Sequence, residues 1–433
     1  MKYIVKPNQQ ALGEITVPGD KSISHRAIML ASIAEGKTTI TGFLHGEDCL
    51  ATLKVFQQMG VQIEYQADGN ITVCGVGRNG LVQPESTLDL GNSGTSIRLL
   101  TGLLAGQPIA TKLIGDQSLM KRPMRRVCDP LLQMGANLET AENGTPPIMI
   151  MPVDKLQGIS YRLPVASAQV KSAILLAGLF AQGKTEIIES KSTRDHTERM
   201  LQSFNYPIEV NNGSISIEGG FKLQATDIQV PADLSSAAFF IVASCIAKQG
   251  EITIHNVGIN QTRIGVLEIL KEMNASIEIT NHAMMGGEPT ASITARSSEL
   301  KGIDVPVHLV PAAIDEFPII CIAAACADGL TRVTQAEELR VKESDRIAQV
   351  AKGLSTLGVE VEEFPDGLTI QGGEFLGGQI ESGHDHRIAM SFAVASLRAK
   401  STIEISDCEN VATSFPGFVG LAQSLGLHVE VLE

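Results

Sequence analysis

The sequence contains no tryptophan, and aromatic residues make up only 4% of its 433 residues. A protein that stacks on nucleobases or anchors a partner through Trp would have few residues to use here. Positive charge is also scarce, because 34 Lys and Arg residues face 48 Asp and Glu residues, giving a formal net charge of −14. Such an acidic chain is not expected to coat nucleic acid or an anionic membrane through its overall field.

Paired cysteine motifs and long apolar runs are missing as well. The seven cysteines are scattered and form no C-x-x-C pair, which favours neither a disulfide framework nor a zinc site. The opening segment MKYIVKPNQQALGEITV has no apolar stretch followed by a small-residue cleavage site. The apolar runs near 173–181 and 319–327 are shorter than the roughly 18 residues of a membrane-spanning helix. We therefore expect a cytoplasmic protein with free thiols.

What the sequence does contain is a repeated unit. An apolar helix end, a Gly turn and an alternating strand recur six times, for example as ASIAEGKTTITG from Ala31 and VASCIAKQGEITIHN from Val242. About 20 residues after each comes a helix stop followed by a second strand, as in QQMGVQIE from Gln57. The length exceeds that of one hydrophobic core, so the six units predict two domains of three units each.

The helix stops predict a specific backbone conformation. The residue that ends each of these helices is either Gly or Asn, the two types that adopt the left-handed conformation most readily. The six positions are Gly60, Gly135, Asn205, Asn274, Gly358 and Gly426. A Pro interrupts the strand in IQVPADLSSAA (from Ile228), and Asp233 can begin a helix there, so this stretch is expected to be a crossover between the domains.

Cations and small polar residues gather at predicted helix starts. The segments are VPGDKSISHR from Val17, LGNSGTSIR from Leu90, LMKRPMRR from Leu119, LRVKESDR from Leu339 and SGHDHRIAM from Ser382. A helix N-terminus next to Lys or Arg is suited to bind an anion, although a capped surface helix would explain each segment taken singly. We expect Gly94 and Thr95 to precede one such helix and Pro123 to lie in the first turn of another.

Together these segments predict a cleft for a small substrate with several negative charges. Asp315, Glu343 and also Glu316 lie among the cations, and their carboxylates could act as general acids or bases. His384 and His386 are two residues apart and have no third ligand nearby in the sequence. A position at a helix cap is therefore favoured over a metal site.

Seven motifs resemble those of the EPSP synthases, the 5-enolpyruvylshikimate-3-phosphate synthase family. They are GDKSISHR (from Gly19), LGNSGTSIR (from Leu90), RPMRR (from Arg122), SAQVKSA (from Ser167), NQTR (from Asn260), LRVKESDR (from Leu339) and DHRIAM (from Asp385). The likeness extends to Ser414-Phe415-Pro416, which covers nearly the whole chain. RPMRR, SAQVK and NQTR are similar to the class II branch, whose members often tolerate glyphosate.

The resemblance implies an α/β fold of two similar domains, each with three βαβαββ repeats (the inverse α/β barrel of enolpyruvyl transferases). We expect residues 1–20 plus 230–433 to form one domain and 21–229 the other, with the active site in the cleft between them. The implied reaction transfers the enolpyruvyl group of phosphoenolpyruvate to the 5-hydroxyl of shikimate 3-phosphate and releases phosphate. This reaction needs no cofactor and no metal. The protein is expected to be active as a monomer.

The resemblance also assigns roles to individual residues. The catalytic residues it implies are Lys21, Asp315 and Glu343. Those implied to bind phosphoenolpyruvate are Lys21, Asn92, Gly94, Thr95, Arg122, Gln169, Arg346 and Arg387. Those implied to bind shikimate 3-phosphate are Lys21, Ser22, Arg26, Ser167, Ala168, Gln169, Ser190, Arg194, Asp315 and Lys342. Many members carry a Lys where this chain has Thr413, which puts one phosphoenolpyruvate contact in doubt.

Two other functions are compatible with parts of the sequence. The related transferase that acts on UDP-N-acetylglucosamine typically has Lys-Asn where this chain has Lys21-Ser22, and it has a Cys in a mobile loop where GDQSLMKRP (from Gly115) has none. A non-catalytic repeat scaffold would have no reason to place Lys21, Arg122 and Arg346 at matching helix starts. Both alternatives are therefore disfavoured.

Overall fold

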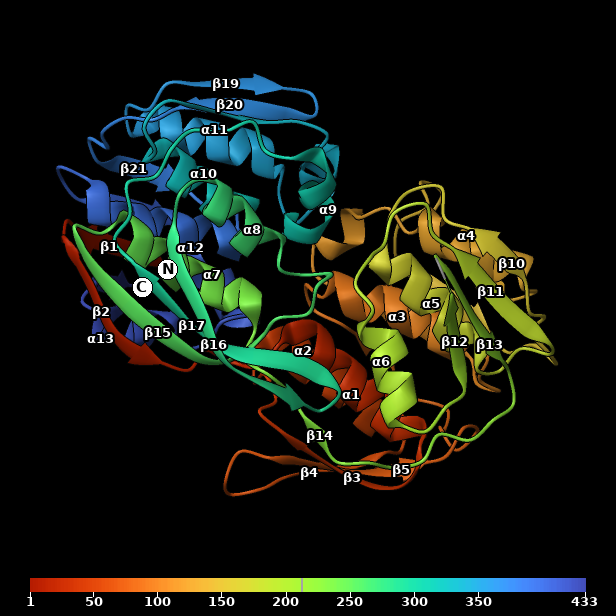
Figure 1. Ribbon diagram of the computed structural model, residues 1–433. Helices are drawn as coiled ribbons and strands as arrows, with labels where there is room; N and C mark the ends of the chain where they lie inside the picture. Colours follow the sequence, from red (N-terminus) through yellow and green to blue (C-terminus); the bar gives the residue numbers. More distant parts are fainter. Residues whose placement is uncertain (212) are drawn as a thin grey trace. The chain divides into compact units, whose positions relative to one another are not determined.

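The computed structural model describes residues 1–211 and 213–433. The chain divides into two compact units (Figure 1). Unit 1 consists of Met1–Pro18, Pro231–Met284 and Glu288–Glu433, and unit 2 of Gly19–Val230 with Met285–Gly287. In neither unit do the described residues contain a helix that is both long and apolar enough to cross a bilayer.

The described residues of unit 2 form three small sheets. The first has the strand order β14-β3-β5-β4, with β3 (Glu35–Thr41), β4 (Gln62–Tyr65), β5 (Ile71–Val76) and β14 (Ile228–Gln229). The second has the order β6-β7-β9-β8, with β6 (Leu88–Asp89), β7 (Thr111–Ile114), β8 (Asn137–Glu139) and β9 (Ile148–Met151). The third has the order β10-β11-β13-β12, with β10 (Ser160–Arg162), β11 (Lys184–Ile188), β12 (Ile208–Asn211) and β13 (Ser214–Glu218).

Unit 1 likewise has three sheets within the described residues. The first has the order β21-β22-β1-β23, with β1 (Lys2–Lys6), β21 (Gly378–Glu381), β22 (Ile403–Ser406) and β23 (His428–Leu432). The second has the order β16-β17-β15-β2, with β2 (Gln10–Ile15), β15 (Gln249–Gly258), β16 (Ser276–Met285) and β17 (Glu288–Arg296). The third has the order β18-β20-β19, with β18 (Leu330–Val333), β19 (Val361–Phe364) and β20 (Gly367–Gln371).

Each repeat contributes an inner helix to the core of its unit. In unit 2 these are α1 (Lys21–Ile33), α3 (Gly94–Ala105) and α5 (Ala168–Gly178), and in unit 1 they are α7 (Leu234–Ile246), α10 (Phe317–Ala325) and α12 (His386–Ala395). Every residue of α7, α10 and α12 is buried. A helix that is apolar on all sides is stable only inside a core. Parallel strands such as β6 and β7, or β10 and β11, are connected through these helices.

A second set of helices packs next to the inner ones. They are α2 (Glu47–Gln58), α4 (Arg125–Gln133) and α6 (His196–Ser203) in unit 2, and α8 (Gly265–Glu272), α9 (Val310–Ala313), α11 (Arg346–Thr356) and α13 (Phe418–Ser424) in unit 1. Short 3-10 helices are η1 (Leu119–Lys121), η2 (Val307–Leu309), η3 (Glu337–Val341), η4 (Ser396–Arg398) and η5 (Cys408–Thr413).

The predicted fold class and helix stops are confirmed. The six sheets of the described residues correspond to the six repeats. All six predicted helix-ending residues have positive φ: Gly60 at 87°, Gly135 at 89°, Asn205 at 58°, Asn274 at 69°, Gly358 at 86° and Gly426 at 102°. Asp233 is the N-cap of α7, and its side chain accepts a hydrogen bond from the Ser235 N–H, as the sequence predicted.

Two predicted helix starts were wrong. Helix α3 begins at Gly94, so Gly94 and Thr95 lie inside it, because Ser93 is the N-cap and its side chain accepts from the Ser96 N–H. Helix α4 begins at Arg125, and Pro123 therefore lies outside it. The Met124 N–H donates to the Gly144 carbonyl, which is a loop contact and not a helical one.

Helices α3 and α5 approach closely because Gly102 has no side chain. A Cβ at Gly102 would lie 2.1 Å from the Ala173 carbonyl oxygen on α5. We therefore expect Gly102→Ala to force the helices apart and to destabilise the protein by about 1–3 kcal/mol, measured by urea unfolding. The matched control is Gly420→Ala on the exposed face of α13, where no atom lies within 4 Å of the added Cβ. Equal stability of the two variants would contradict the prediction.

Candidate active site

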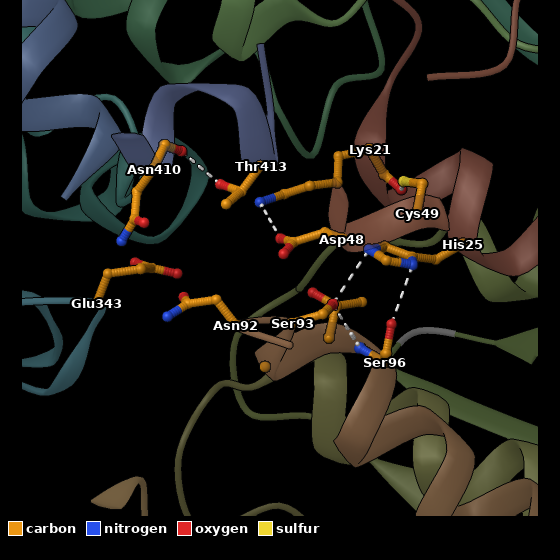
Figure 2. Close-up of polar contacts among 12 residues, drawn as sticks. Lys21, His25, Asp48, Cys49, Asn92, Ser93, Ser96, Glu343, Asn410 and Thr413 are labelled. Carbon is orange, nitrogen blue, oxygen red and sulfur yellow. Dashed lines mark hydrogen bonds and ion pairs between the residues drawn. The ribbon is translucent and has the colours of Figure 1, made fainter. Parts of the chain in front are cut away.

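In unit 2 the first cation of the site stands at the start of α1. Asp20 caps this helix by accepting a hydrogen bond from the Ile23 N–H. The Lys21 Nζ lies 3.0 Å from the Asp48 Oδ2 on α2, and the two side chains are 18% and 8% exposed (Figure 2). The carboxylate therefore holds the ammonium group at the N-terminus of α1 and limits its freedom in solvent.

The loop before α3 holds a second cation. The Arg122 guanidinium donates from Nη2 to the Asn92 Oδ1 at 2.7 Å and to the Ser118 Oγ at 3.3 Å. Asn92 in turn donates to the Asp116 Oδ2 at 2.6 Å. A Cβ at Gly94 would lie 2.8 Å from the Arg122 Nη1, so glycine at this position lets the guanidinium approach the first turn of α3.

Gln169 connects the starts of α3 and α5. Its Oε1 accepts from the Arg98 Nη1 at 2.7 Å, and its Nε2 donates to the Thr95 Oγ1 at 3.0 Å. Ser167 caps α5 by accepting from the Val170 N–H, and Ala168 is the first residue of that helix. The N-termini of α3 and α5 are thus joined by side chains, and their N–H groups and Arg98 form one positively polarised region.

Arg26 on α1 is buried, with 3% of its surface exposed to solvent. Its guanidinium donates to the Ser22 carbonyl at 2.9 Å, to the Thr197 Oγ1 at 2.7 Å and to the Ser172 Oγ at 2.7 Å. It thereby ties α1 to α5 and α6. Of the other residues assigned to shikimate 3-phosphate in this unit, Ser190 is exposed and Arg194 is half-buried, both in the loop between β11 and α6.

A buried histidine connects α1 to the cap of α3. The His25 Nδ1 lies 2.8 Å from the Thr52 Oγ1. The same Nδ1 lies 3.1 Å from the Ser96 Oγ, and the His25 Nε2 lies 3.3 Å from the Ser93 Oγ (Figure 2). The pKa of His25 lies well below its usual value of 6.5 because burial disfavours the charged ring and because Lys21 and Arg26 are close. A neutral His25 therefore supports the N-cap of α3.

In unit 1 the predicted residues gather around Arg346, whose side chain is 1% exposed. Its Nε lies 2.8 Å from the Asp385 Oδ2, and its Nη2 lies 2.6 Å from the Glu343 Oε2. Burial lowers the pKa of Arg346, but Asp385, Glu343 and Asp315 outweigh that effect and raise it. Burial by itself would raise the pKa of Asp385. The charge of Arg346 and the hydrogen bond that it donates act in the opposite direction, and the pKa of Asp385 is lowered overall.

Two further groups of unit 1 complete this region. The Lys342 Nζ lies 3.1 Å from the Asp315 Oδ1, which is also 3.7 Å from the Arg346 Nη1. Arg387 lies in the first turn of α12, which Asp385 caps by accepting from the Arg387 N–H. The hydroxyl of Thr413 donates a hydrogen bond to the Asn410 carbonyl at 2.6 Å (Figure 2).

The structure brings the predicted residues together as two sets. Unit 2 gathers Lys21, Asn92, Arg122 and Gln169 with their neighbours at the starts of α1, α3 and α5. Unit 1 gathers Asp315, Lys342, Glu343, Arg346 and Arg387 before or in the first turns of α10, α11 and α12. Sequence reasoning assigned no role to Asp48, His25 or Arg98. A buried polar residue within an apolar helix is the signal that could have identified His25.

Within the described residues of unit 1, one group of side chains has donor atoms suited to a metal. His384, Asp407 and Glu409 in unit 1 offer ligand atoms that all lie within 4.8 Å of one another. The Glu409 carboxylate, however, is paired with the amino group of Met1. That ion pair accounts for the position of Glu409 without a metal.

Repeated βα units, with cations at the N-termini of buried helices and carboxylates beside them, are suited to bind small anionic substrates. The enolpyruvyl transferases are a class of enzyme that acts on such substrates.

Comparison with known proteins places the chain in a particular family. Residues 5–421 match the EPSP synthase (3-phosphoshikimate 1-carboxyvinyltransferase) family, and the chain belongs to it. The 3-phosphoshikimate 1-carboxyvinyltransferase of Methylococcus capsulatus is 57% identical, over 99% of this chain and 98% of the relative. That of Legionella pneumophila (strain Lens) is 53% identical, over 99% of both chains.

A solved structure agrees with these relatives. An EPSP synthase from Acinetobacter baumannii is 52% identical, covers 100% of both chains and superposes with a TM-score of 0.89. The predicted fold, family and transferase activity in aromatic amino acid biosynthesis are therefore confirmed. The UDP-N-acetylglucosamine transferase and the scaffold are not supported.

The low pKa of His25 makes stability depend on pH. Below about pH 6.5 an unfolded chain protonates this residue while the folded chain does not, so its contribution is complete above that pH and decreases as pH falls. The decrease has a slope of at most about 1.4 kcal/mol per pH unit. We expect the stability advantage of the wild type over His25→Asn, measured by urea unfolding, to shrink between pH 7.5 and pH 5. A difference that stays constant over this range would contradict the assignment.

Proposed function

We propose that the two sets of residues act on the same pair of substrates, phosphoenolpyruvate and shikimate 3-phosphate, and transfer the enolpyruvyl group to the 5-hydroxyl with release of phosphate. One observation carries the proposal. In each unit, cations gather at the N-termini of buried inner helices, and these cations lie within residues 5–421, the range that matches the family.

The chemistry requires proton transfers in both directions. The oxygen of the 5-hydroxyl bonds to C2 of phosphoenolpyruvate and loses its proton, while C3 gains a proton, which gives a tetrahedral intermediate. The bond from C2 to the phosphate oxygen then breaks, C3 loses a proton, and the enol double bond forms again. Asp315 and Glu343 are the carboxylates that we assign to these transfers, and Lys21 stabilises the charge of the departing phosphate.

The contacts of these groups support their roles. Lys342 and Arg346 lie within 4.0 Å of the Asp315 carboxylate, and Arg346 within 2.6 Å of Glu343. Neighbouring cations favour the ionised form of a carboxyl group, which is the form that accepts a proton. Lys21, restrained by Asp48, presents a cation at the start of α1, where the helix dipole also favours an anion.

The substrate contacts are divided between the units. In unit 2, phosphoenolpyruvate would contact Lys21, Arg122, Gln169 and the Asn92–Thr95 segment, and in unit 1 it would contact Arg346 and Arg387. Shikimate 3-phosphate would contact Ser22, Arg26, Arg194, Ser190 and the Ser167–Gln169 segment, with Asp315 and Lys342 from unit 1. A cytoplasmic location and a monomeric state stay predictions.

Phosphate release tests the reaction. The purified protein is mixed with phosphoenolpyruvate and either shikimate 3-phosphate or UDP-N-acetylglucosamine, and free phosphate is measured over time. We expect turnover with shikimate 3-phosphate only, because the residues of unit 2 match the family that uses it. Turnover with UDP-N-acetylglucosamine alone would contradict the proposal.

The site residues are tested by substitution. We expect Glu343→Ala to lower kcat by about 10²–10⁴-fold, the usual contribution of a general acid or base. Lys21→Ala should lower kcat/KM to a similar degree, because a cation is lost where charge develops in the transition state.

The control is Arg125→Ala. Arg125 is exposed, and its Nη2 donates to the Glu142 carbonyl at 3.3 Å. This variant should keep nearly full activity, with all three variants showing a wild-type circular dichroism spectrum. Near-wild-type rates for both Lys21→Ala and Glu343→Ala would refute the assignment.

A further inference from the structure

A carboxylate that the proposed mechanism does not use lies buried in unit 1, where α7, α10 and α12 begin. Glu316 directly precedes α10 and is 1% exposed. Its Oε1 accepts a hydrogen bond from the hydroxyl of Ser235, which lies in the first turn of α7. The carboxylate is therefore fixed on one side by a neutral donor.

Two guanidinium groups face the same oxygen of Glu316. The Arg263 Nη2 lies 3.7 Å from the Oε1, and the Arg387 Nη1 lies 3.6 Å from it. Arg263 is further held by the Ser235 Oγ at 2.7 Å and by the Asp233 Oδ1 at 3.4 Å. One buried anion thus lies between a cation anchored within the core and the cation that we assign to phosphoenolpyruvate.

The contact between Glu316 and Arg387 is one of charge. Among the described residues, the Arg387 Nη1 and the Glu316 Oε2 have no hydrogen-bond partner. Glu316 therefore orients the Arg387 guanidinium electrostatically while this N–H group stays able to donate to a substrate anion. If Arg263 were absent, Arg387 would be the guanidinium that balances the charge of Glu316. The Glu316 carboxylate would then compete with the substrate anion for Arg387.

We propose that Glu316 is a positioning residue for Arg387 and that Arg263 is the counter-charge that keeps Glu316 from neutralising Arg387. The inference rests on the proposed function, because it takes Arg387 to be a phosphoenolpyruvate contact. It also gives a role to the NQTR segment, which includes Arg263 but supplies none of the proposed substrate contacts. Asn260 of that segment donates to the Glu288 Oε2 at 2.9 Å, which helps to hold the segment in place.

Steady-state kinetics with both substrates varied provides the test. Glu316→Gln keeps the size and the hydrogen-bond acceptor but removes the charge, so Arg387 and Arg263 face each other without an anion between them. We expect its KM for phosphoenolpyruvate to rise about tenfold and its KM for shikimate 3-phosphate to change less than about twofold. Arg263→Gln should raise the same KM, and Arg263→Lys, which keeps the charge, should restore most of the loss.

The double variant distinguishes an electrostatic effect of Glu316 and Arg263 on Arg387 from an effect of lost packing. Removing Glu316 and Arg263 together deletes one negative and one positive charge, so Glu316→Gln/Arg263→Gln should raise the KM for phosphoenolpyruvate at least threefold less than the product of the single effects. The control is Glu278→Gln, which breaks an exposed 3.2 Å contact with Arg296 and should leave both KM values unchanged.

Several outcomes would overturn the inference. They are an unchanged KM for phosphoenolpyruvate in Glu316→Gln, an equal rise of both KM values, or multiplicative effects in the double variant. If Glu316→Gln does not fold, as judged by circular dichroism, Arg263→Lys against Arg263→Gln decides the question. Arg387→Lys tests the underlying assignment separately: no rise of the KM for phosphoenolpyruvate in that variant would refute the proposed role of Arg387 itself.

Discussion

The complete burial of the inner helices is the constraint on which the rest of the structure depends. Helices such as α7 and α10 are covered on all sides, so a polar side chain along their length would lose its hydration without a partner. The Lys and Arg residues of the inner helices accordingly lie in the first two turns, namely Lys21, Arg26, Arg98, Lys171 and Arg387. Among the described residues of each unit, three inner helices begin close together, so their charged residues are also close to one another. The backbone N–H groups at these helix starts add to the attraction for anions.

Buried cations near those helix starts need counter-charges, and the structure supplies them locally. The side chain of Lys171 on α5 is 1% exposed and lies 2.7 Å from Glu198 and 3.1 Å from Glu189. Burial raises the pKa of Glu198 despite this contact. Removing one partner of such a buried pair typically lowers the free energy of unfolding by about 3–5 kcal/mol, because the other charge stays buried without an opposite charge. The overall excess of acid, with a net charge of −14, therefore does not conflict with cationic sites.

The printed contacts of the buried arginines differ in kind between Arg26 and Arg122 of unit 2 and Arg346 of unit 1. In unit 2 the hydroxyls of Ser172 and Thr197 accept from Arg26, and the amide of Asn92 accepts from Arg122. Such neutral acceptors orient a guanidinium without cancelling its charge. In unit 1 carboxylates surround Arg346 instead. Unit 1 thus places a buried cation next to the carboxylates that proton transfer requires.

Much of the fold could be predicted from the sequence, and the structure brings many of the residues assigned to the site close to one another within each unit. Periodic apolar patterns and the Gly or Asn helix stops depend on local backbone preferences, so the six repeats and the left-handed residues such as Asn205 and Gly358 were predicted correctly. The motifs indicated the family correctly, and the site residues that they imply stay predictions. The start of α3 was misplaced because Ser93 could not be recognised as its cap without the geometry of the first turn.

Other features were decided only by the tertiary structure. The partners Asp48 for Lys21, Gln169 for Arg98 and Glu316 for Arg387 lie 27, 71 and 71 positions away along the chain. No local preference links residues at such separations, and the energy of each contact depends on a distance and a degree of burial that packing alone sets. The sequence therefore determined the repeating architecture and the identity of the charged groups, and the fold determined which of those charges are paired.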